Sequence, residues 1–180
     1  MATIYSIGHG TRDLDGFLAL LKGAKIERLV DVRAVPRSRR HPHFGYGPLG
    51  ARLEAERLRY EWRGRELGGR RRAGDVNRHA GLTEPAFRAY AEHMEAAPFR
   101  AAAEALAQAA EAERVCMMCA ERDPAHCHRS LIADWLLAHG HCVVHLLDDG
   151  GRREHAMHPA ARLEGDLLHY ADRSAQGELF

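Results

Sequence analysis

The chain has 180 residues, 46% of them hydrophobic, and a net charge of +1. This length buries one full core and is short for two, so we expect one compact domain at 1–172 and a tail at 173–180. No run approaches the roughly 20 apolar residues of a membrane span, and no secretory signal opens the sequence. We therefore expect a cytoplasmic protein with no membrane partner.

Positive charge is concentrated in the first part of the chain. Residues 1–80 hold 17 Lys and Arg against 9 Asp and Glu, whereas 81–180 hold 9 against 16. Arg supplies nearly all of the positive charge, and a planar guanidinium suits bidentate phosphate contacts. The alternative is that a GC-rich genome has enriched the chain in Arg. The four cysteines are typical of thiols or ligands rather than of disulfides in a reducing compartment.

Predicted strands and helices alternate along the chain. In order, they are a strand within 3–10, a helix at 13–24 capped by Asp13, a strand at 26–36, an Arg-rich surface insertion at 38–81 with one helical stretch at 49–59, helices at 84–95 and 99–113, a strand at 114–121, a helix at 130–140 and a strand at 142–147. This pattern predicts an α/β fold, a small and mostly parallel sheet flanked by helices in Rossmann-like layering.

Polar residues follow three of these strands, at 9–12, 31–40 and 119–129. Ligands of open parallel sheets bind beyond the carboxyl ends of the strands, so we expect one shared site. The candidates for catalysis are His9, Asp31, Glu121 and Cys119. The alternative role for Asp31 is that of an ion-pair partner that orients Arg33. The candidates for binding phosphate or nucleic acid are Arg12, Arg33, Ser38, Arg39, Arg70, Cys127, His128 and Arg129.

The run CHRS at 127–130 directly precedes a predicted helix. Backbone amides and the positive end of the helix dipole attract anions there, and Arg129 adds a charged fork. The run therefore predicts a phosphate site. The alternative is a simple helix cap at Ser130 or Asp123 with a solvated Arg129.

The cysteines leave two further possibilities open. Cys116, Cys119, Cys127 and His128 are nominal zinc ligands, but the first two lie three residues apart on a predicted strand and face opposite sides. We predict no cofactor and keep structural zinc at Cys119, Cys127 and His128 as an alternative. A nucleophilic thiolate at a helix N-terminus is the other, although the Cys-x5-Arg spacing of cysteine phosphatases is absent.

Two arginine clusters predict contacts with a nucleic-acid backbone. The first is DVRAVPRSRRHPHF at 31–44, and the second, at 63–72, follows Tyr60 and Trp62. Guanidinium groups neutralise phosphates, and the aromatic rings are available for base stacking. The alternative is two solvated loops.

Four ordered motifs resemble the bacterial and archaeal family known as domain of unknown function 488. They are SIGHG, DVRAVPRSRR, YEWRGRELGGRR and CAERDPAHCHRSLIADWL, within about 6–147. Ten residues occupy the motif positions of the family: His9, Asp31, Arg33, Ser38, Gly68, Cys119, Glu121, Cys127, His128 and Arg129. The resemblance implies a small α/β domain and no established reaction, and some members carry a DNA-repair label.

The final residues QGELF resemble the peptides that bind bacterial sliding clamps. In that pattern Leu179 and Phe180 fill an apolar pocket and Gln176 forms a hydrogen bond beside it. Folding of the tail back onto the domain is the alternative.

Together these features favour a nucleic-acid-processing or DNA-repair-associated enzyme, with DNA favoured over RNA as its partner and the sliding clamp as a further partner. In this interpretation arginines hold phosphates, and Asp31 or Glu121 with His9 supplies acid/base catalysis. One alternative is a cysteine-dependent enzyme that acts on a small phosphorylated or sulfur-containing metabolite. The other is a non-catalytic module that binds nucleic acid or the clamp.

Overall fold

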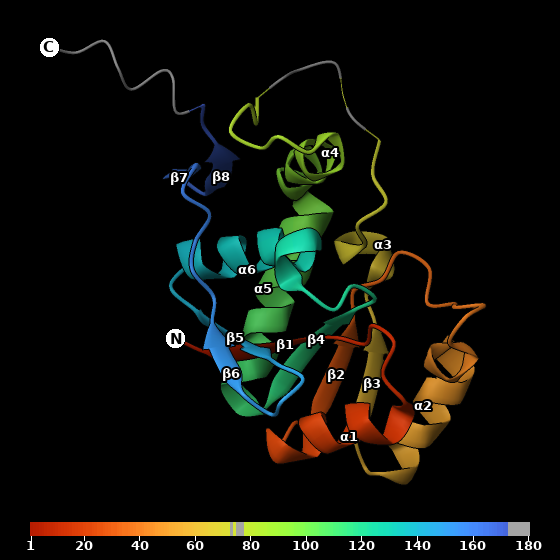
Figure 1. The fold of residues 1–180 in the computed structure, drawn as a ribbon. Coiled ribbons are helices and arrows are strands. Elements are labelled where there is room, and N and C mark those ends of the chain that lie inside the picture. The colour runs from red at the N-terminus through yellow and green to blue at the C-terminus, as the bar shows by residue number, and fades with distance from the viewer. Residues whose placement is uncertain (73, 75–77, 173–180) are drawn as a thin grey trace, which may run out of the picture.

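The computed structural model shows a six-stranded sheet with helices on both faces (Figure 1). It describes residues 1–72, 74 and 78–172. The strands of the sheet are β1 (Thr3–Gly8), β2 (Arg28–Asp31), β3 (Arg59–Trp62), β4 (Val115–Cys119), β5 (Cys142–Leu146) and β6 (Arg152–Glu154). Their order is β3-β2-β4-β1-β5-β6, and all neighbours are parallel except β5 and β6. The predicted α/β fold is confirmed.

Two groups of helices cover the two faces of the sheet. Helices α1 (Leu14–Gly23) and α2 (Tyr46–Ala55) pack on one face, and α5 (Ala97–Ala112) and α6 (Arg129–Ala138) on the other, where α4 (Pro85–Met94) packs against α5 and α6. A short helix, α3 (Gly64–Leu67), contacts α5. The hairpin of β7 (Ala161–Glu164) and β8 (Leu167–Tyr170) lies beside α4 (Figure 1). Turns of 3-10 helix occupy Pro42–Phe44 and Pro124–His126.

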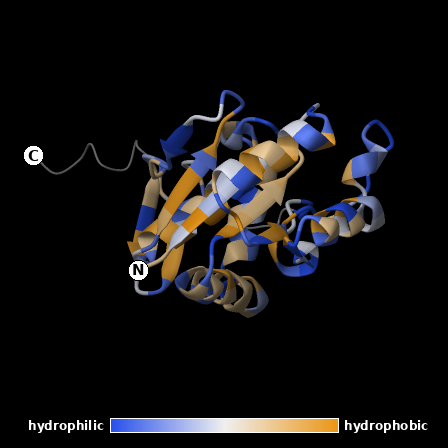
Figure 2. Ribbon diagram, turned by 90° about the horizontal axis from the view of Figure 1, so that it is seen from below, coloured by the Kyte–Doolittle hydropathy of each residue, from blue (hydrophilic) through white to orange (hydrophobic). Residues whose placement is uncertain are grey.

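The alternation of side chains along the strands builds two cores. Tyr5, Cys116 and Met118 join the core under α1 and α2, whereas Met117 and Cys119 join the core under α5 and α6. Cys116 and Cys119 therefore face opposite layers, as their spacing predicts. Figure 2 shows the hydrophobic colour concentrated in the central strands.

The ends of several predicted elements differ in the structure. The second strand stops at Asp31 rather than at residue 36, because the Asp31 carboxylate accepts the Arg33 amide and bends the chain there. The 38–81 segment is more than a surface insertion, since it contributes the edge strand β3. The sequence RYEW has too little apolar content to reveal a half-buried edge strand. No helix in the described part of the chain is long and apolar enough to cross a membrane.

Candidate functional site

A cleft opens beyond the carboxyl ends of β1, β2 and β4, with a volume of about 330 Å³. His9, Arg33 and Cys119, which follow or end these strands, line it together. The remaining lining residues come from the loop after β2, the Gly69–Arg70 segment, the start of α4 and the loop before α6. The three polar segments of the sequence thus meet at one edge of the sheet, as parallel strand order requires.

Two thiols and one imidazole face one another at the floor of this cleft. The Cys119 Sγ lies 3.8 Å from His128 Nδ1, and the Cys127 Sγ lies 3.7 Å from the same nitrogen. The other ring nitrogen of His128, Nε2, is 3.0 Å from the Val32 carbonyl oxygen. A carbonyl only accepts, so Nε2 carries the hydrogen and Nδ1 presents its lone pair to the sulfurs.

The two thiols titrate as a pair. Hydrogen bonding from Cys127, together with His128, holds the pKa of Cys119 well below its ordinary value. Burial and the neighbouring Cys119 raise the pKa of Cys127. Removal of one proton from the pair therefore leaves the negative charge on Cys119 and a hydrogen on Cys127.

Gly69 leaves space beside the cluster, and it is not among the site residues predicted from the sequence. A Cβ at this position would lie 2.4 Å from His128 Nδ1 and 2.7 Å from its Cγ. Any side chain here would therefore displace the imidazole or fill the space in front of its lone pair. The glycine pair in the ELGG run is the sequence feature that could have revealed it, because glycine is favoured where the backbone approaches another group closely.

His9 lines the cleft as a neutral side chain. Its ring stacks on Phe44 with 4.4 Å between centroids, Nδ1 donates to the Gly10 carbonyl, and Nε2 lies 3.4 Å from Arg33 Nη1. Burial lowers its pKa to about 4. A base this weak is poorly matched to proton abstraction near neutral pH, so His9 suits hydrogen bonding better than the acid/base role expected from the sequence.

Asp31 is the buried ion-pair partner of Arg33, which is the alternative to its predicted role as a catalytic base. Its side chain is fully buried, with 0% exposure, and does not line the cleft. Arg33 binds both carboxylate oxygens through Nε and Nη2, and the Tyr60 hydroxyl donates to Oδ2 at 2.6 Å. Arg33, a predicted phosphate ligand, therefore has a structural partner. The ion pair with Asp31 occupies its Nε and Nη2 groups.

Arg129 likewise has a structural role instead of the predicted phosphate contact. Its side chain is 1% exposed, and its guanidinium donates to the carbonyl oxygens of Glu121 and Arg122. The amides of Ser130 and Leu131 bond to the Cys127 and His128 carbonyls, so they are not free for an anion. Arg129 instead holds the loop that carries Glu121, whose exposed side chain lines the cleft.

The other predicted phosphate ligands divide into two groups. Arg12 bonds the Gly8 carbonyl and pairs with Asp148, away from the cleft lining. Ser38 and Arg70 line the cleft, and so does Arg37 of the first arginine cluster. Arg39 is exposed in the same loop without lining the cleft.

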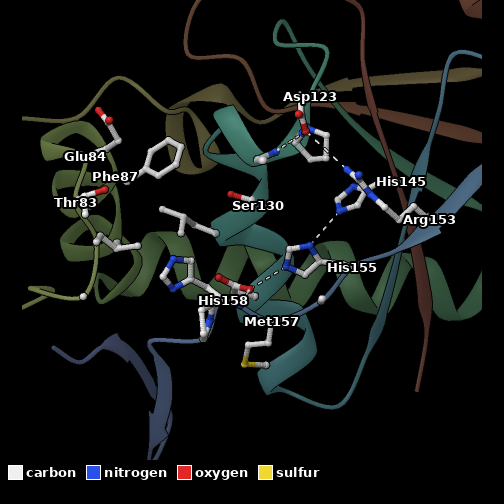
Figure 3. A pocket seen from close by; sticks show the side chains of 18 of the residues that line it. Thr83, Glu84, Phe87, Asp123, Ser130, His145, Arg153, His155, Met157 and His158 are labelled. Atoms are coloured by element: carbon white, nitrogen blue, oxygen red, sulfur yellow. Dashed lines mark hydrogen bonds and ion pairs between the residues drawn. The ribbon is translucent and has the colours of Figure 1, made fainter. Parts of the chain in front are cut away.

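A second pocket of about 640 Å³ shares one lining residue, Phe87, with this cleft (Figure 3). Three of its lining residues form a network, in which Asp134 Oδ1 accepts from His155 Nε2 at 2.8 Å and His155 Nδ1 lies 3.0 Å from His145 Nε2. The Tyr170 hydroxyl donates to Asp134 Oδ2 at 2.9 Å. Sequence reasoning missed this network, because its members come from four separate segments.

The tail residues Gln176, Leu179 and Phe180 lie outside the described residues, so the clamp-binding peptide stays a prediction. No curated protein and no solved structure matches the chain. A family model described as "Domain of unknown function DUF488" matches residues 13–136. That match spans more than half of the 180 residues, and the chain therefore belongs to the DUF488 family.

Proposed function

We propose that the protein is an enzyme that acts on nucleic acid or nucleotides, with Cys119, Cys127 and His128 as its reacting centre. The observation that carries this proposal is the presence, in one cleft, of that centre and of cations without a structural partner. Arg37 and Arg70 line the cleft, and neither forms an ion pair with a described carboxylate. Arg12, Arg33 and Arg129, in contrast, are bound by carboxylates or backbone carbonyls of the fold.

The arginines would hold phosphate groups while the cluster acts on the bound molecule. Free guanidinium groups on a cleft rim neutralise phosphates and release counterions. The Ser38 hydroxyl, which accepts the His41 amide at 2.9 Å, retains its own hydrogen for a phosphate oxygen. Glu121, on the same cleft wall, supplies a carboxylate for proton transfer.

Binding of a short fluorescent single-stranded oligonucleotide across a salt series tests the proposal. Arg37→Gln with Arg70→Gln should flatten the slope of log affinity against log salt by about 1.4, since each phosphate contact on a single strand contributes roughly 0.7. The matched control is Lys25→Gln with Arg57→Gln, which removes two exposed charges before β2 and β3, at the opposite edge of the sheet.

The control should keep the parent slope. Equal slopes for the parent and the cleft variant would reject phosphate binding in this cleft and favour the small-metabolite alternative. For the reaction itself, mass spectrometry of oligonucleotides and nucleotides incubated with the protein should show a product that Cys119→Ser no longer forms. The absence of any product with the parent would favour a binding module.

A further inference from the structure

We propose that Cys119, Cys127 and His128 bind one zinc ion through two thiolates and Nδ1, with a fourth coordination position open to the cleft. The three ligand atoms lie within 4.8 Å of one another. This metal site concerns the same centre as the proposed function, and the inference of a catalytic rather than a structural zinc rests on that function.

The distances between the ligand atoms fit a tetrahedral ion. Zinc binds thiolate sulfur at about 2.3 Å and imidazole nitrogen at about 2.0 to 2.1 Å, which places the two atoms about 3.6 Å apart at a tetrahedral angle. The sulfurs of Cys119 and Cys127 lie 3.8 and 3.7 Å from His128 Nδ1. A zinc ion therefore fits between them after movements of a few tenths of an ångström.

The hydrogen bond of His128 Nε2 to the Val32 carbonyl supports the same conclusion. A histidine that binds a metal commonly donates its other ring N–H to a carbonyl or carboxylate, which fixes the tautomer and the ring orientation. Here that bond is 3.0 Å long, and it leaves the lone pair of Nδ1 directed at the two sulfurs.

Cys127 separates a metal site from a simple nucleophile. A thiolate activated by histidine needs one cysteine, and Cys119 alone would satisfy that arrangement. Beside such a nucleophile Cys127 would only donate a hydrogen bond to Cys119, whereas two thiolates and an imidazole at nearly equal distances are a ligand set that suits zinc. Two adjacent thiols can also form a disulfide, and the metal-binding experiments distinguish that outcome.

The cleft supplies the open position. Structural zinc sites are closed by four protein ligands, whereas catalytic sites keep one position for water or substrate. Among the described residues three ligands meet here, and all of them line the cleft. Gly69 leaves space in front of Nδ1. A bound zinc would acidify a water in the open position, and Glu121, which lines the same cleft, would be available as the proton acceptor.

The chain offers its own matched controls, since Cys116 is buried on the other face of the sheet and Cys142 is exposed. Protein purified without chelator should contain one zinc per chain by elemental mass spectrometry. Cys119→Ser, Cys127→Ser and His128→Ala should each lose most of it, whereas Cys142→Ser should retain it. Gly69→Ala, which alters no ligand, should lower zinc affinity by at least tenfold.

Cobalt added to the chelator-treated parent tests the site without relying on the folding of any variant. It should produce a thiolate-to-cobalt charge-transfer band with the visible bands of a tetrahedral site. A parent without zinc and without these bands would overturn the proposal, as would a Cys119–Cys127 disulfide in protein kept under reducing conditions. Zinc without the salt-dependent oligonucleotide binding described above would retain the metal site and reject the proposed function.

Discussion

Two histidine-containing clusters line the two pockets that share Phe87, and they differ in what their polar atoms contact. In the Asp134 cluster, the carboxylate binds His155, the His158 amide and the Tyr170 hydroxyl, and only His145 Nδ1 has no partner. In the Cys119 cluster, one nitrogen of His128 is held by a carbonyl, and the other faces two sulfurs in an open cleft. The first arrangement holds segments together, and the second leaves ligand atoms available.

The Asp134 cluster joins α6 to the segment after β6 and to the hairpin. His155 and His158 belong to that segment, and Tyr170 ends β8. A hydrogen-bonded buried carboxylate of this kind stabilises a fold because each donor loses its partner when the carboxylate is removed. We therefore expect variants of this cluster to affect stability and variants of the Cys119 cluster to affect chemistry.

Asp134→Ala should produce the largest loss of stability. It leaves His155 and Tyr170 buried without an acceptor, and the free energy of unfolding should fall by about 3 to 5 kcal/mol. Urea denaturation measures this change. Glu104→Ala, which removes an exposed carboxylate on α5, is the control and should stay within about 0.5 kcal/mol of the parent. An equally small effect of both substitutions would contradict a structural role for the network.

Acid should weaken the fold through His145. Burial is the largest cause that lowers its pKa to about 3, followed by the charges of His155, Arg129 and Arg153. The carboxylate of Asp123 raises the pKa by a smaller amount. The unfolded chain binds a proton below about pH 6.5 and the folded chain does not, so stability is lost as pH falls from 6.5 towards 3. Between pH 7 and pH 5 this amounts to about 2 kcal/mol. In His145→Gln that part of the pH dependence should disappear, and an unchanged dependence would show that another group is responsible.

The sequence predicts the elements that have strong patterns. VCMMC at 115–119 is a continuous apolar run and becomes the central strand β4, and Gly140, with φ +82°, follows α6 as predicted. Strand β3 was missed because RYEW is polar and only half-buried at the sheet edge. Helix α6 was recognised, but its buried Asp134 follows from no local pattern.

The candidate site was predicted in part, because strand order fixes where segments meet but not how each side chain is used. His9, Cys119, Glu121 and the Cys127–His128 pair were placed at one sheet edge, and they line one cleft. The charged groups of Asp31 and Arg129 are of the kind that bind substrates, but inside the fold they form hydrogen bonds with other residues. The partner of Asp31 that is distant in sequence is Tyr60. Only the three-dimensional contacts distinguish these cases.

Tyr170→Phe should give the smallest effect. It removes one hydroxyl donor to Asp134 and keeps the ring, so the free energy of unfolding should fall by about 1 kcal/mol. Zinc content and oligonucleotide binding should equal those of the parent, because this residue does not line the Cys119 cleft. A loss of zinc in this variant would mean that the two clusters are coupled across Phe87.

X-ray absorption at the zinc edge of the purified protein tests the account most directly, because it counts the atoms around the metal. We predict two sulfurs at about 2.3 Å and two nitrogen or oxygen atoms at about 2.0 to 2.1 Å, one from His128 and one from a water in the open position. Cys142→Ser should give the same spectrum. A shell of four sulfurs, or a shell without sulfur, would contradict the assignment of the Cys119, Cys127 and His128 cluster as a zinc centre.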